Sequence, residues 1–155
     1  MKRPMDCTEP AAVFRRLYEL ISGPAEQERD WAAVRDLFDP DALLHSELTL
    51  PDGSHQSGTW SVHEFCETAA EEYRQSGFWE REVACRAECF GDIAQVWSTY
   101  ESRVGSPASA PAGRGVNAVH LLRRKGTWRI VSVIFQLERG TDGIPSAYLP
   151  GHGAG

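Results

Sequence analysis

The segment from Gly115 to Glu138 constrains the fold more than any other part of the chain. It consists of two runs rich in β-branched and aromatic residues, separated by a short polar turn at residues 124–127, which is typical of a long β-hairpin. Successive side chains of a strand point to opposite faces. Both faces of the second arm are apolar, with Trp128, Ile130 and Ile134 on one face and Val131, Val133, Phe135 and Leu137 on the other. Such a strand has to be covered on both sides, so we expect helices over one face and a second subunit over the other.

The size and charge of the chain exclude several classes of protein. Its 155 residues are enough for one domain with its own core, and 41% hydrophobic and 25% charged residues are typical of a globular protein. The net charge of −6 argues against binding to a nucleic-acid backbone, which requires clustered Lys and Arg. No segment has the roughly 20 consecutive apolar residues of a membrane span, and the first ten residues lack the apolar run of a signal peptide. We therefore expect a cytoplasmic protein with no nucleic-acid or membrane partner.

The four cysteines, Cys7, Cys66, Cys85 and Cys89, do not have the spacing of a metal site. Cys85 and Cys89 fall on one predicted strand, where four residues span about 13 Å, too far to share an ion or to form a disulfide with each other. His63 and Cys66 lie three residues apart on a predicted helix, but no third ligand accompanies them. We therefore expect buried free thiols, no metal ion and no cofactor.

Apolar periodicity predicts three helices ahead of the last four strands. Thr8 is a suitable N-cap for the first helix, which should end at the break of residues 22–24. A short second helix starts near Trp31, and Ser61 with Glu64 forms a capping box that opens the third. Strands are expected at residues 42–57 around a turn at 51–54, at 79–90, at 93–104 and in the hairpin.

The order of these elements predicts an α+β fold, because two helices, two strands, one helix and four strands leave the helices segregated to one side of an antiparallel sheet. Residues 105–114 form a low-complexity loop without apolar anchors. We expect a single domain over residues 8–140, with flexible ends at residues 1–7 and 141–155.

Three stretches of the sequence resemble the nuclear transport factor 2-like superfamily and, within it, the SnoaL-like group. They are Asp30-Trp31 through Phe38 to Ala42, Phe90 to Ala94, and Gly126 to Val131, and the resemblance covers roughly residues 11–138. The resemblance implies a cone-shaped half-barrel of a curved, mainly antiparallel sheet, with three helices on its concave face, a pocket at the wide end, and dimerisation through the outer face. It implies no single function, because the superfamily holds isomerases, cyclases, dehydratases, transport factors and assembly domains.

The resemblance also implies that the strand face carrying Trp128 lines the pocket. Pairing the hairpin around its turn then places Asn117 on the same face as Ser132 and Gln136, as polar groups that either bind a ligand or satisfy one another. His120 faces the subunit interface in this register, and a slip of one residue exchanges Asn117 with His120. The residues expected to contact a ligand are Tyr18, Trp31, Tyr100, Asn117, Ser132 and Gln136.

His45 is the candidate catalytic residue. It lies near the position where steroid-isomerase members of the superfamily carry a catalytic carboxylate, although a plain count places Ser46 there. Ser46 cannot hold a proton near neutral pH unaided, whereas an inward-facing His45 can, with Glu47 as a conceivable partner. Tyr18 falls within one residue of the phenol that polarises a ketone in isomerase-like members. The alternative for His45 is a half-exposed histidine on a strand, and the alternative for Tyr18 is a tyrosine of the core.

The sequence favours a dimeric protein that binds a small apolar or carbonyl-containing ligand in a largely apolar pocket. One alternative is a cofactor-free isomerase, cyclase or dehydratase, SnoaL-like or steroid-isomerase-like, that uses His45 as acid and base. The second alternative is an adaptor that binds another protein through the outer sheet face. Whether His45 points into an enclosed cavity or to water discriminates between the binding protein and the enzyme.

Overall fold

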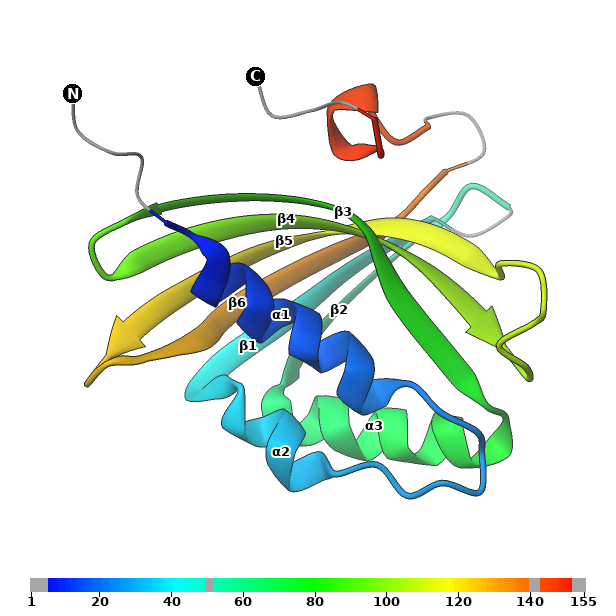
Figure 1. The fold of residues 1–155 in the computed structure, drawn as a ribbon. Helices are drawn as coiled ribbons and strands as arrows, with labels where there is room; N and C mark the ends of the chain where they lie inside the picture. Colours follow the sequence, from blue (N-terminus) through cyan, green and yellow to red (C-terminus); the bar gives the residue numbers. More distant parts are fainter. Residues whose placement is uncertain (1–5, 50–51, 140–142, 152–155) are drawn as a thin grey trace.

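A strongly curved sheet with three helices on its concave side makes up the fold (Figure 1). The computed structural model describes residues 6–49, 52–139 and 143–151. The helices are α1 (Thr8–Ile21), α2 (Trp31–Asp36) and α3 (Val62–Gln75). The strands are β1 (Phe38–Thr49), β2 (His55–Ser61), β3 (Phe78–Phe90), β4 (Ile93–Val104), β5 (Gly113–Arg124) and β6 (Thr127–Leu137), and the 3-10 helix η1 spans Ser146–Tyr148. The α+β class and the order of elements are as predicted.

Within the described residues the sheet has the strand order β2-β1-β6-β5-β4-β3. Every neighbouring pair is antiparallel except β1 and β6, which run parallel. The predicted hairpin is β5 and β6, and its turn has positive φ at Lys125 (52°) and Gly126 (79°). Positive φ at both central residues is the mark of the type I′ turn that matches the twist of a hairpin. No helix in the described ranges is long and apolar enough to cross a membrane.

A bulge in β6 changes which side chains face the helices. His120 pairs with Ser132, but Leu121 pairs with Ile130, so Val131 is an extra residue on its strand. An extra residue bends the strand and reverses the alternation of faces beyond it. The predicted faces of β6 are therefore wrong after Ile130. The concave face carries Trp128, Ile130, Val133, Phe135 and Leu137, and the outer face carries Ser132, Ile134 and Gln136.

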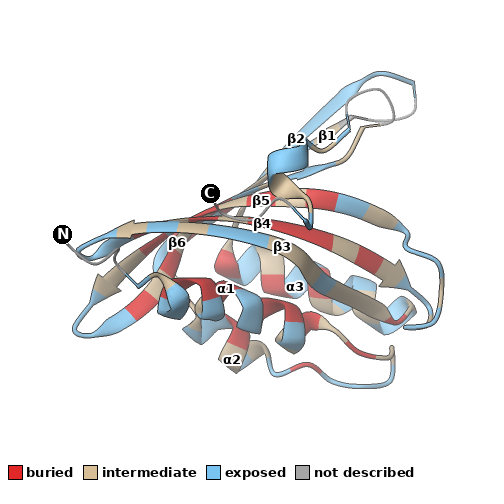
Figure 2. Ribbon diagram, turned by 45° about the horizontal axis from the view of Figure 1, so that its top comes forward, coloured by how far each residue is buried: buried red, intermediate tan, exposed pale blue. Residues whose placement is uncertain are grey.

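The hydrophobic core lies between the helices and the concave face. In Figure 2 the buried residues lie on the helices and along the central strands. The apolar stripe of α1, Phe14, Leu17, Tyr18 and Ile21, is fully buried there. The helix α3 begins at the predicted N-cap, because the Ser61 Oγ accepts a hydrogen bond from the Glu64 backbone N–H at 3.1 Å.

The segment after β6 packs against the outer face of the sheet, on the side away from the helices (Figure 1). The rings of Tyr148 and Trp97 stack with centroids 5.0 Å apart, and the Thr99 hydroxyl donates to the Tyr148 carbonyl at 2.5 Å. Residues 143–151 therefore have a defined place, although they fall in the end expected to be flexible. Residues 1–5, 141–142 and 152–155 of the two expected flexible ends lie outside the described residues, as does residue 140 at the end of the expected domain.

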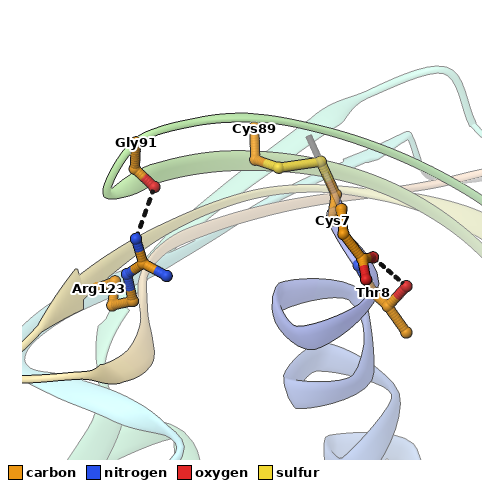
Figure 3. Close-up of a disulfide and its surroundings, with 6 residues drawn as sticks. Cys7, Thr8, Cys89, Gly91 and Arg123 are labelled. Atoms are coloured by element: carbon orange, nitrogen blue, oxygen red, sulfur yellow. Dashed lines mark hydrogen bonds between the residues drawn. A yellow bond between two sulfur atoms is a disulfide. The ribbon is translucent and has the colours of Figure 1, made fainter. Parts of the chain in front are cut away.

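A disulfide joins Cys7, just before α1, to Cys89 near the end of β3 (Figure 3). The prediction of free thiols is wrong for this pair, because the partner of Cys89 comes from 82 residues earlier in the chain and not from its own strand. Cys66 is free and buried as expected, whereas Cys85 is free but exposed.

The disulfide should make a large contribution to stability. A cross-link between residues 82 positions apart restricts the unfolded chain strongly. We expect the Cys7→Ser/Cys89→Ser double variant to lose about 2–4 kcal/mol of unfolding free energy. Reduction of the wild type with dithiothreitol should lower its unfolding free energy by the same amount. Urea unfolding followed by circular dichroism measures both, and Cys85→Ser is the matched control that should change little. Equal urea midpoints for the double variant and the wild type would contradict this expectation.

Candidate functional site

A cavity of about 530 Å³ lies between the helices and the concave face of the sheet. This volume is in the range of small-molecule sites in proteins. Its walls come from α1, α3 and all six strands, and are mainly apolar. The aromatic residues of the lining are Phe14, Tyr18, Trp60, Phe65, Tyr73, Phe78, Tyr100 and Phe135.

Two glycines make room for two of these rings. A Cβ on Gly115 would overlap the Tyr100 phenol, and a Cβ on Gly58 would overlap the Trp60 indole. Glycine in a strand often marks such a close approach. The Trp60 ring in turn stacks on Phe135 with centroids 6.1 Å apart. The aromatic wall is therefore fixed by the backbone beneath it as well as by its own packing.

A chain of hydrogen bonds at one end of the cavity involves Tyr18, Asn117, Ser98 and Glu82. The Asn117 Nδ2 donates to the Tyr18 Oη at 2.9 Å, and the Ser98 Oγ donates to a Glu82 carboxylate oxygen at 2.6 Å. The Tyr18 and Ser98 oxygens are 2.7 Å apart, and since the Ser98 proton goes to Glu82, Tyr18 is the donor in that pair. Burial raises the pKa of Tyr18, so the phenol keeps this proton at neutral pH. Its single proton is thus committed to Ser98.

Glu80 is the titratable group that distinguishes the cavity. It lies on the concave face of β3, and burial raises the pKa of its carboxyl to about 8. Its backbone is held in place because the Glu80 N–H donates to the Ser22 Oγ at 3.0 Å, next to the bridge between Gly23 and Phe78. Among the described residues no side chain forms a hydrogen bond or ion pair with the Glu80 carboxylate. The carboxylate of Glu82, two residues on, is by contrast bound by Ser98 and by Arg15 at 3.1 Å.

Three of the predicted ligand contacts lie together in the cavity wall, namely Tyr18, Tyr100 and Asn117. Trp31 lies outside the wall and stacks on Tyr73 with centroids 6.1 Å apart. The remaining two predicted contacts, Ser132 and Gln136, face outward because of the bulge at Val131. The structure also decides between Asn117 and His120, since Asn117 is buried in the cavity wall and His120 is exposed on the outer face.

His45 does not face the cavity. It pairs with Thr59 and with the outward-facing Ile134, and its Nδ1 lies 3.2 Å from the Thr59 Oγ1. Glu47 shares this outer face and accepts a hydrogen bond from Ser57 at 2.8 Å. The predicted placement of His45 as an inward acid and base is therefore wrong, because Leu44 is its neighbour that points into the core.

Sequence reasoning missed Glu80 and Tyr73. The sequence did contain a signal for Glu80. Phe78, Glu80 and Glu82 are every second residue of β3, so they share one face of the strand, and this face carries two carboxylates against the helices. Trp79 and Arg81 on the other face give a similar mixture of apolar and charged residues, so alternation alone did not decide which face is inner. Within the described ranges no group of three or more His, Cys, Asp or Glu side chains could hold a metal ion.

The raised pKa of Glu80 predicts that stability falls as the pH rises. The folded protein holds this proton up to a pH of about 8, whereas the unfolded chain releases it near 4.5. The stabilising contribution is therefore complete below pH 4.5 and is lost as the pH rises through 8. Between pH 6 and pH 9 we expect the wild type to lose about 2–3 kcal/mol of unfolding free energy relative to Glu80→Gln, whose amide cannot ionise. Urea unfolding of both proteins across this range measures the difference, and parallel pH profiles would contradict it.

The structure is similar to several solved structures of low sequence identity. A Nostoc punctiforme protein of unknown function with a cystatin-like fold is 14% identical, with a TM-score of 0.65 over 96% of this chain and 98% of that one. A Mycobacterium tuberculosis protein of unknown function is 19% identical, with a TM-score of 0.65 over 91% of this chain and 74% of that one. A Streptomyces avermitilis protein, named provisionally as a dehydratase of the NTF2-like family, is 15% identical, with a TM-score of 0.61 over 86% of this chain and 96% of that one.

The sequence itself matches no protein-family model and no curated protein. At these identities the likeness to solved structures concerns the fold, which hosts many unrelated functions. It confirms the predicted architecture, a curved sheet with helices on its concave face. The chain thus has the α+β cone fold of the nuclear transport factor 2-like (NTF2-like) proteins.

Proposed function

We propose that the protein binds a small molecule that has an apolar body and one polar group. The observation that carries this proposal is the cavity of about 530 Å³ between the helices and the sheet, with its mainly apolar and aromatic wall. Two polar groups of the wall lie near Tyr18, because Asn117 donates to its hydroxyl and Glu80 interacts with it electrostatically. An apolar cavity with a few convergent polar groups is the usual form of a small-molecule site.

A binding role fits the polar groups better than ketone isomerisation does. The Tyr18 proton is committed to Ser98, so the phenol has none to offer to a ligand carbonyl. His45, the base expected for that chemistry, lies on the outer face. These two observations weigh against His45 as the acid and base of the isomerase-like alternative and against Tyr18 among its three candidates for orienting an oxyanion, Tyr18, Tyr100 and Asn117.

Proton transfer by Glu80 is a second candidate function. A carboxyl group whose pKa lies near 8 can hold or accept a proton close to neutral pH, as a general acid or base must. This observation is specific to Glu80 and gives the isomerase, cyclase or dehydratase alternative a different residue. It ranks second because Asn117 and Tyr18, two donors of the cavity wall that could stabilise a developing negative charge, donate to Tyr18 and to Ser98 instead.

Blocking the cavity tests the binding proposal. Ala69 is buried on α3 and lines the cavity, so Ala69→Trp would fill part of the space with an indole ring. We expect the wild type to bind the neutral fluorescent probe N-phenyl-1-naphthylamine, and the variant to bind it at least about tenfold more weakly. Fluorescence titration measures both affinities, and Val133→Phe repeats the test from the sheet side.

The control for this experiment is Phe90→Ser. Phe90 is 76% exposed at the end of β3, far from the cavity lining, and would attract an apolar probe nonspecifically. Its replacement should leave the affinity unchanged. Binding that survives both cavity-filling variants, or that disappears in Phe90→Ser, would overturn the proposal.

We also propose that two copies of the chain pair through the outer face of the sheet. Leu43 on β1 and Ile134 on β6 are 44% and 46% exposed there, close together on adjacent strands. The segment carrying Tyr148 already covers Trp97 on β4, so the open part of this face lies over β1, β6 and β5. Burial of such apolar side chains is a common basis of a homodimer.

Replacing Ile134 by Asp should separate the two copies, because it places a charge in the centre of the proposed contact. Multi-angle light scattering at micromolar concentration should give a dimer for the wild type and a monomer for Ile134→Asp. Ile93→Asp, at the β3–β4 turn, is the control and should remain a dimer. A monomeric wild type would remove this proposal and favour a different protein as the partner of the outer face.

A further inference from the structure

The charged groups of the cavity are all acidic. Glu80 and Glu72 are the carboxylates of its lining, and among the described residues the lining contains no Lys, Arg or His. Glu72 lies on the exposed side of α3, at the rim, whereas Glu80 is half-buried on β3. An anionic ligand such as a fatty acid would meet a carboxylate here and no cation to balance it.

The side chains around Glu80 are aromatic. Three tyrosines, one from each neighbouring element, lie close enough to interact electrostatically with the Glu80 carboxylate: Tyr18 from α1, Tyr73 from α3 and Tyr100 from β4. The Tyr18 and Tyr100 ring centroids are 6.4 Å apart. The face of an aromatic ring attracts a cation, and the attraction is stronger where water is excluded. A carboxylate among aromatic rings is thus suited to a positively charged group.

The basic residues nearest to Glu80 are all engaged elsewhere. Arg29 lies over the Tyr73 ring at 5.3 Å and donates to backbone carbonyls, among them that of Ile21 at 3.1 Å. A groove beside β3 that also reaches Glu80 contains three further arginines. Of these, Arg15 pairs with Glu82, and Arg81 and Arg103 pair with Glu101. No cation of the described chain neutralises Glu80, so a ligand would have to supply it.

We infer that the cavity takes a hydrophobic amine, whose ammonium group donates to the Glu80 carboxylate beside the rings of Tyr18 and Tyr100, and whose apolar body lies along the aromatic wall. The faces of the Tyr73 ring are already occupied, because the ring is stacked on Phe78 with centroids 4.6 Å apart and lies under Arg29. This inference rests on the proposed binding function and names the chemical class of its ligand. Glu82, the second carboxylate on this face of β3, does not compete for the ammonium, because Ser98 and Arg15 occupy its oxygens.

The pH dependence of binding follows from this arrangement. An ammonium binds the ionised form of Glu80, so its affinity should rise as the pH rises toward 8. The groups that face Glu80 are Tyr18, Tyr73 and Tyr100, whose pKa values are all raised, and they stay neutral across this range. A neutral ligand that accepts a hydrogen bond would bind the protonated carboxyl instead, and its affinity would fall over the same range.

A series of probes with one skeleton tests the inference. The probes are 6-phenylhexylamine, 6-phenylhexanol and 6-phenylhexanoate, titrated by calorimetry at pH 6.0, 7.0 and 8.5. We expect the amine to bind most tightly at pH 8.5, with an affinity at least about tenfold above that of the alcohol, and the carboxylate to bind most weakly. The affinity of the amine should increase from pH 6.0 to pH 8.5.

The variants separate this inference from the proposed function. Glu80→Gln should lower the affinity for the amine at pH 8.5 at least about tenfold and abolish its pH dependence. Glu72→Gln removes a charge at the rim and should change the amine affinity less than about threefold. If the alcohol binds as well as the amine, or if Glu80→Gln leaves the amine unaffected, the inference is wrong and the binding function stands. If none of the three probes binds while N-phenyl-1-naphthylamine does, the inference alone is wrong, and if none of the four binds, both are wrong.

Discussion

The hydrogen-bonded chain from Asn117 through Tyr18 and Ser98 to Glu82 determines how α1 lies on the sheet. Burying the Tyr18 hydroxyl among apolar side chains would be costly without partners. The chain supplies them from β5, β4 and β3, and Arg15 of α1 binds the carboxylate at its end. The rotation of α1 about its axis is thereby fixed, and with it the width of the cavity that α1 helps to enclose.

The parts of the fold that the sequence predicted well depend on local signals. The β5–β6 hairpin follows from two apolar runs around a turn, and the start of α3 follows from Ser61 three residues before Glu64. The apolar period of α1 identified its buried stripe. Tyr18, Tyr100 and Asn117 lie in the cavity wall as expected. Alternation along a strand and the 3.6-residue period of a helix group each of them with apolar neighbours, but the resemblance identified the concave face of the hairpin.

The parts that were missed depend on single residues or on long-range contacts. Val131 is one apolar residue within an apolar run, so nothing in the pattern marks it as the bulge that turns Ser132 and Gln136 outward. The bond between Cys7 and Cys89 joins residues 82 positions apart, and spacing within one strand could not predict it. Disulfides are rare in the reducing cytosol, so this bond weighs against the cytoplasmic location expected from the amino-terminal sequence.

Glu80 and Glu82 show that partners, more than position, decide what a buried carboxylate can do. Both lie on the concave face of β3, two residues apart and beside the same α1 helix. Glu82 is bound by Ser98 and Arg15, and so belongs to the framework that holds Tyr18. Glu80 has only its backbone fixed, by Ser22, and burial raises the pKa of its free carboxyl to about 8. Of these two carboxylates, Glu80 is therefore the one that a ligand can still satisfy.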